Sequence, residues 1–94
     1  MYTKLKYDGF EKYLYKVREE SNLHYIFKFD NGYGASVIKN IMSYGHAQDL
    51  FELAVIKFVD GLWSFCYSTE ITDDVLGYLE NDDVLDLLER IKNL

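Results

Sequence analysis

The fold of this chain is decided around FKFDNGYGASV (residues 27–37), where strand-forming runs flank Asn31 and Gly32. Asn-Gly is the pair that best adopts the two positive φ angles of a type I′ turn, so we expect a hairpin of strands 23–30 and 33–39. A large ring over a glycine is a common arrangement between paired strands, which explains the glycine in this stretch. A two-residue turn also fixes which residues face one another: Asp30 and Tyr33, Phe29 and Gly34, and Phe27 and Ser36.

A second hairpin is expected from residues 50–59 and 62–67, joined by a tight turn at Asp60 and Gly61. Alternation along its strands gives two faces. One face carries most of the large apolar side chains and is predicted to be core: Ala54, Ile56, Phe58, Trp63, Phe65 and Tyr67. The opposite face is apolar enough to need a partial cover: Val55, Val59, Leu62 and Cys66.

A helical pattern precedes the strands. Asp8 followed by Glu11 matches a capping pattern, with an acid three residues after a carboxylate at the N-cap. Apolar residues then recur at helical spacing from Phe10 to Val17. These features predict an amphipathic helix over residues 8–20.

Two short helical patterns follow the strands. Thr72 can cap a helix that begins at Asp73, and Asn81 can cap another that begins at Asp82. We expect both to pack on the face of the second hairpin that carries Trp63. The predicted fold is therefore α+β, in the order αββββαα: a four-stranded antiparallel sheet of two hairpins, an N-terminal helix and two short C-terminal helices.

The composition is that of a globular protein, with 49% hydrophobic and 28% charged residues, and we expect a single domain over residues 1–94. No apolar run reaches the roughly 18 residues that cross a bilayer, and the N-terminus lacks the apolar stretch of a signal peptide. We therefore predict a cytoplasmic protein that does not contact membranes. Cys66 is the single cysteine, and no set of residues has the spacing of a zinc site, so no metal and no cofactor are predicted.

Motifs for catalysis are missing from the sequence. No pattern for nucleophilic catalysis, zinc-dependent hydrolysis or phosphate binding is present, and we interpret His24 and His46 as surface or hydrogen-bonded residues. The stretch DNGYG (residues 30–34) has residue types of a calcium loop but lacks the remaining ligand positions, so we interpret it as a turn. We expect no enzymatic activity.

Charge is unevenly distributed along the chain. The net charge is −6, and residues 1–66 balance, with eight Lys or Arg and eight Asp or Glu. The last 28 residues carry two basic residues against eight acidic ones: Glu70, Asp73, Asp74, Glu80, Asp82, Asp83, Asp86 and Glu89. Because the basic residues are scattered along the sequence, we expect no direct binding of nucleic acid.

Two interpretations of the acidic residues stay open. Asp73, Asp74, Asp82 and Asp83 would each lie in a first helical turn, where the helix dipole favours carboxylates. The other four exceed what capping requires, and an acidic face would steer onto a basic surface of a partner protein. The aromatic residues near the first hairpin are equally open to two interpretations, as core of a small sheet or as contact surface; Tyr33 and Tyr44 are the candidates for contact.

The segments FDNGYGASV and ITDDVLGYL resemble a family of small proteins encoded by phages and prophages of Gram-positive bacteria, and the resemblance runs from about Tyr25 to Leu94. The predicted helix 8–20 departs from that family, whose members begin near the first strand. The resemblance implies no enzymatic activity and no catalytic residue. It implies a host-interaction role, such as the inhibition of host defence by anti-CRISPR proteins that occupy nucleic-acid channels.

The predicted function is therefore that of a non-enzymatic, acidic phage- or prophage-type protein that binds a host protein with a basic surface. The acidic residues of the last 28 positions would attract the partner, and Tyr33 and Tyr44 would supply buried contact. The alternative is a structural homo-oligomer, a homodimer in the simplest case, whose subunits meet through the partly covered sheet face around Val55, Val59 and Leu62.

Overall fold

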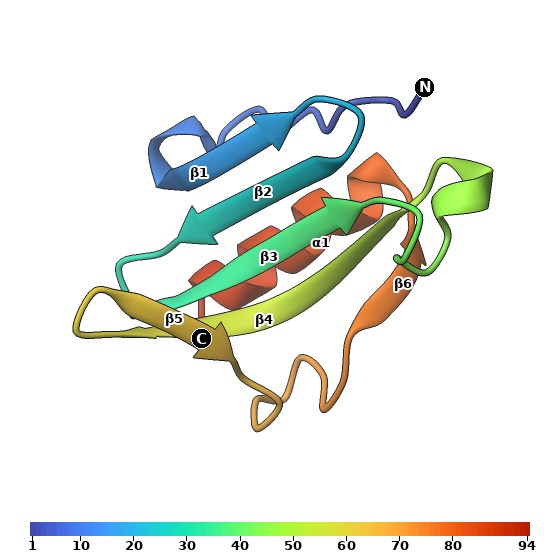
Figure 1. The fold of residues 1–94 in the computed structure, drawn as a ribbon. Coiled ribbons are helices and arrows are strands. Elements are labelled where there is room, and N and C mark those ends of the chain that lie inside the picture. The colour runs from blue at the N-terminus through green and yellow to red at the C-terminus, as the bar shows by residue number, and fades with distance from the viewer.

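One antiparallel sheet of six strands organises the molecule, and the computed structural model describes all of residues 1–94. The strands are β1 (Leu14–Glu19), β2 (Leu23–Lys28), β3 (Tyr33–Lys39), β4 (Phe51–Val59), β5 (Leu62–Phe65) and β6 (Leu76–Leu79). β1 to β5 are neighbours in chain order, while β6 pairs with the same edge of β4 as β5 but nearer its start. A single α-helix, α1 (Asn81–Lys92), lies behind the sheet in Figure 1, and the face toward the viewer carries no helix.

The core lies between the sheet and a cover made of α1 and the N-terminal segment 1–13. From α1 the buried side chains are Val84, Leu87, Leu88 and Ile91. From the N-terminal segment, Leu5 and Phe10 are buried in the same cluster, and the Tyr7 ring lies 5.8 Å from that of Phe27. This cover leaves the opposite sheet face without a second layer.

The predicted fold class is wrong in its elements: the sheet has six strands, there is no N-terminal helix, and there is one C-terminal helix. The N-terminal error has a physical cause in β1, which lies within the range 8–20 predicted to be helical. Leu14 pairs with Phe27 and Val17 with Tyr25, with a bulge between them. A bulge inserts one extra residue, so residues three apart point to the same face of the strand. That spacing is also the spacing of a helix, which is why the pattern predicted one.

The turn of the first hairpin also differs from the prediction. The Phe29 N–H donates to the Tyr33 carbonyl at 2.8 Å, so three residues form the loop. Gly32, with φ of 87°, has a positive φ angle and Asn31 does not, which excludes a type I′ turn. The Asn31 side chain instead donates to the Ile91 carbonyl at 2.9 Å, tying the turn to the C-terminal end of α1.

This loop shifts the hairpin by one residue relative to the predicted pairing. Phe27 faces Ala35 and Lys28 faces Gly34. A glycine is required at position 34 because a Cβ there would collide with the Phe27 carbonyl oxygen. A slip of one residue exchanges the two faces of a strand, so the predicted assignment of faces could not hold across the whole sheet.

The second hairpin turns as predicted but faces the other way. Asp60 and Gly61 both have positive φ angles, 54° and 80°, as a type I′ turn requires. Val55, however, lies in the core beneath α1, and Trp63 lies on the opposite face. The prediction that helices pack on the Trp63 face is therefore wrong. On that face β2 and β3 contribute polar residues, which a helix-covered face would have to bury without partners.

Of the two predicted C-terminal helices, only the second exists, and it begins at Asn81 with Glu80 as N-cap. The segment predicted to start a helix at Asp73 is a loop followed by β6, whose Leu79 pairs with Phe51. The free edge of β4 offers this short apolar segment backbone partners that a two-turn helix would not provide. The molecule is compact, with a radius of gyration of 12.2 Å, and no helix is both long and apolar enough to span a membrane.

Candidate binding surfaces

The acidic residues of α1 form one exposed stripe, which we call the acidic stripe: Asp82, Asp83, Asp86 and Glu89. Spacings of three and four residues keep these carboxylates on the solvent side of the helix, opposite its buried apolar residues. Only Glu89 has a basic partner, the Lys92 ammonium at 3.3 Å. Hydrogen bonds from Asn93 and Lys92 lower the pKa of Glu89. The other three carboxylates have no basic side chain within ion-pair distance.

The four other candidate acids are less united. Glu80 and Asp83 make reciprocal hydrogen bonds in a capping box, so both also stabilise the start of α1. Glu70 lines a hollow with Glu89 and therefore extends the acidic stripe. Asp73 and Asp74 are exposed in the loop between β5 and β6, where Asp74 accepts the Val75 N–H at 2.7 Å.

The two candidate tyrosines lie at opposite ends of β3. Tyr33, at its start, is half-buried against the core, and the Lys57 ammonium lies 5.2 Å from its ring centroid. Tyr44 follows the end of the strand, is 60% exposed and packs its Cβ against Gly77. Tyr33 therefore has a packing role, and the structure does not bring the two residues together.

The uncovered face of the sheet, which we call the open face, was not predicted as a surface. It carries Lys16 and Arg18 from β1, His24, Ile26 and Lys28 from β2, Ser36 and Ile38 from β3, Glu52, Ala54, Ile56 and Phe58 from β4, and Trp63 and Phe65 from β5. These residues are far apart in the sequence and come together only through strand pairing. The sequence signal that could have revealed this face is the polar residue at every second position of 24–28.

Two adjoining hollows cross the open face. One, of about 300 Å³, has His24, Ser36, Glu52, Trp63 and Phe65 among its lining residues. The other, of about 160 Å³, is lined by Lys16, Arg18, His24, Ile26 and Trp63. Because His24 and Trp63 line both, the hollows form a single groove, basic at the β1 end and aromatic at the β5 end.

Three aromatic rings follow one another at the β5 end of this groove. The Trp63 and Phe65 centroids are 5.6 Å apart in an edge-to-face contact, and those of Phe65 and Tyr67 are 6.1 Å apart with nearly parallel planes. Phe65 is 54% exposed and Tyr67 43% exposed. Monomeric proteins seldom leave adjacent large rings in water without a use for them.

The β1 end of the groove is electropositive. Neither Lys16 nor Arg18 has an acidic side chain within ion-pair distance. Burial lowers the pKa of His24, and the charges of Arg18 and Lys16 lower it further. The neutral His24 ring shares a hydrogen bond with Ser36 at 3.0 Å.

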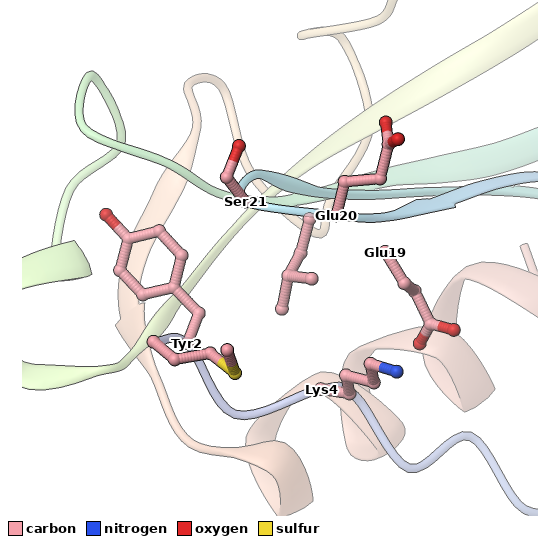
Figure 2. Close-up of a pocket in the computed structure, with 7 residues that line it drawn as sticks. Tyr2, Lys4, Glu19, Glu20 and Ser21 are labelled. Atoms are coloured by element: carbon pink, nitrogen blue, oxygen red, sulfur yellow. The ribbon is translucent and has the colours of Figure 1, made fainter.

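The largest hollow, of about 710 Å³, lies between the N-terminal segment and the β1–β2 turn. Figure 2 shows Tyr2 and Lys4 on one side of it, and the carboxylates of Glu19 and Glu20 pointing in different directions. Glu19 accepts a hydrogen bond from the Tyr25 hydroxyl at 2.7 Å, and burial together with this bond raises the pKa of Tyr25. Glu19 thus positions a core tyrosine.

A buried lysine is the residue that sequence reasoning missed most completely. The Lys39 side chain is fully buried, and its ammonium donates to Asp49 at 2.9 Å and to the Thr3 carbonyl at 2.8 Å. The Phe51 ring centroid lies 3.7 Å away. Hydrogen bonds from Thr3 and Lys39 lower the pKa of Asp49 to about 2. This cluster joins the N-terminal segment to the β3–β4 connection and is structural.

No group of three or more His, Cys, Asp and Glu residues is placed to hold a metal ion. Hydrogen bonds from Ser68 lower the pKa of Cys66. No family model, curated protein or solved structure matches the chain.

Proposed function

We propose that this protein acts by binding another protein, with the acidic stripe of α1 as the docking surface for a basic partner. The observation that carries the proposal is the set of three stripe carboxylates, Asp82, Asp83 and Asp86, that no basic side chain neutralises. Such uncompensated charge on a rigid helix attracts an oppositely charged surface over distances comparable to the Debye length, about 8 Å in physiological salt.

The geometry of α1 supports this role. The buried residues of the helix hold it against the sheet, so its outward side is presented without flexibility. A preorganised surface loses little conformational entropy on binding. With the resemblance to phage and prophage proteins, the partner we propose is a cytoplasmic host protein whose basic surface ordinarily holds nucleic acid, as in anti-CRISPR inhibition.

The homo-oligomer alternative loses part of its proposed interface. Val55 is buried in the core, which leaves Val59 and Leu62, 61% and 76% exposed, at the tip of the second hairpin. A patch of this size is small for a stable dimer, which needs about 600 Å² or more from each subunit. Light scattering at high protein concentration tests it, since a strict monomer would exclude this interface.

The test of the docking surface neutralises stripe residues that do not cap the helix. The variant combines Asp82→Asn, Asp86→Asn and Glu89→Gln. Its control removes the same charge elsewhere, with Glu11→Gln, Glu20→Gln and Asp60→Asn.

Each tagged protein is used to capture partners from a host lysate over a range of salt concentrations, and captured proteins are identified by mass spectrometry. We expect the stripe variant to associate with a captured basic protein at least about tenfold more slowly, and the control to behave as the wild type. Equal capture by both variants, without salt dependence, would contradict the proposal.

A further inference from the structure

We infer that the open face binds single-stranded nucleic acid, with bases stacked on Phe65 and Trp63 and the phosphate backbone held by Lys16 and Arg18. This site is separate from the acidic stripe, on the opposite side of the sheet. It is carried by the groove that joins a basic end to an aromatic end across one uncovered face.

The basic residues of this groove are clustered in space although they are separated in sequence. Lys16 pairs with Ile26, and Arg18 pairs with His24, so both side chains rise from β1 beside β2. Neither is neutralised by a neighbouring carboxylate. Scattered basic residues in the sequence argued against nucleic-acid binding, and strand pairing removes that argument for this face.

The aromatic end supplies what bases need. Phe65 and Tyr67 present exposed rings, and Trp63 lines both hollows of the groove. Stacking on aromatic side chains holds bases of any identity, because each base has a π-face. Ser36 and Glu52 in the larger hollow add hydrogen-bonding groups that could contact the edge of a base.

The net charge of −6 does not prevent this binding. The acidic stripe lies on the outer side of α1, behind the sheet and the core (Figure 1). A helix with its side chains is about 10 Å thick, so the stripe lies beyond a Debye length of about 8 Å from the open face. A strand on the open face therefore meets mainly the charges of Lys16, Arg18 and Lys28.

A single strand suits this face better than the alternatives. A duplex keeps its bases stacked on one another and unavailable to Phe65 and Trp63. An acidic protein segment would satisfy Lys16 and Arg18 but would leave the aromatic row unused. Both alternatives are separable from the inference by experiment.

Trp63 is the only tryptophan in the chain and provides a direct reporter. Fluorescein-labelled oligo(dT) and oligo(U) are titrated with the full chain, and both anisotropy and tryptophan quenching are followed. We expect saturable binding with quenching, and weaker binding of a duplex of equal length and of polyglutamate. Absence of anisotropy change and quenching, or equal affinity for the duplex or polyglutamate, would overturn the inference.

Variants separate stacking from charge. Phe65→Ala, at a half-exposed position, should weaken oligonucleotide binding about tenfold or more, whereas Leu62→Ala, a control on the same strand, should not. Lys16→Gln with Arg18→Gln should reduce the slope of log affinity against log salt by about 1.4, since each phosphate contact to a single strand contributes about 0.7.

Wild-type affinity in Phe65→Ala, or an unchanged slope in the double variant, would overturn the proposed contacts. The stripe variant of α1 should bind oligonucleotide as the wild type does. Failure of this site and failure of the protein-docking proposal are thus distinguishable.

Discussion

Asp49→Asn removes the anionic partner of a buried lysine and should be among the most damaging conservative changes in this chain. Lys39 is fully buried, and Asp49, the Thr3 carbonyl and the Phe51 ring together surround its ammonium. Asn keeps the shape of Asp and tolerates the φ of 62° found at this position, so the backbone is undisturbed. What changes is the charge that balances the ammonium.

The expected loss of stability is about 2 kcal/mol. Breaking a fully buried ion pair by removing one partner costs about 3–5 kcal/mol, because the other charge is left uncompensated. The Asp49 side chain is 41% exposed, so water screens part of the interaction and a value below that range applies. The amide also turns a donor toward the Thr3 N–H, which loses its acceptor. In a domain of this size, a loss of about 2 kcal/mol lowers the Tm by roughly 8–16 °C.

Urea unfolding followed by Trp63 fluorescence measures this loss, with Asp86→Asn as the control because it neutralises an exposed carboxylate without a partner. Adding Lys39→Met to Asp49→Asn should recover most of the stability, since it removes the unpaired charge and leaves an apolar side chain. A loss below about 0.5 kcal/mol for Asp49→Asn, or no recovery in the double variant, would refute the reasoning.

The pH dependence supplies an independent readout of the same cluster. The pKa of Asp49 in the folded protein, about 2, lies below the ordinary value of 3.8. The folded state therefore binds fewer protons than the unfolded chain in this range, and the stabilisation is complete above about pH 4. It should be lost as the pH falls from about 4 to 2 in the wild type, and this part of the acid titration should be missing in Asp49→Asn.

Three further changes test other parts of the structure. Gly34→Ala should destabilise the fold by about 1–3 kcal/mol or more in urea unfolding, because its Cβ meets the Phe27 carbonyl oxygen; wild-type stability would disprove the close approach. Leu88→Ala should lower stability by about 2–5 kcal/mol through an internal cavity beneath α1, as measured by thermal unfolding, and a loss typical of a surface position would contradict the burial. Because the pKa of His24 is lowered in the folded state, its contribution is complete above about pH 6.5 and declines as the pH falls below that value; NMR titration of the ring should give a midpoint below 6.5, and a midpoint above it would contradict the electropositive groove.

The local turn chemistry of the chain was predictable, and the pairing between strands was not. Asp60-Gly61 specifies its type I′ turn because both positions need positive φ angles. Asn31-Gly32 has equally good turn chemistry, yet the Asn31 side chain makes a long-range bond to the end of α1 and the loop grows to three residues. No local rule contains that contact.

The error in the faces of the sheet follows from this single residue. Taken alone, the second hairpin has its larger aromatic side chains on the Trp63 face, so that face seemed to be core. The pairing of all four central strands decides otherwise, because His24, Lys28 and Ser36 share a face with Trp63. A slip of one residue reverses every side chain of a strand, so a face can be assigned only when all strands are aligned.

The candidate sites divide in the same way. The acidic stripe was predictable because the period of a helix alone places Asp82, Asp86 and Glu89 together. The open face was not, since it draws single residues from five strands whose alignment the sequence does not state. Lys39 was missed because its acidic partner lies across an irregular connection from the end of β3.

The open face is a consequence of supply: the chain offers one 12-residue helix and an N-terminal segment to cover a six-stranded sheet. One face must then be sealed by its own side chains, and Ile26, 2% exposed, is sealed in this way beside Trp63. Sealing explains Trp63, which is half-buried. It does not explain Phe65, whose ring is 54% exposed at the end of the groove. Stability and binding therefore separate at Phe65, since its removal uncovers little of the core and takes away a stacking surface.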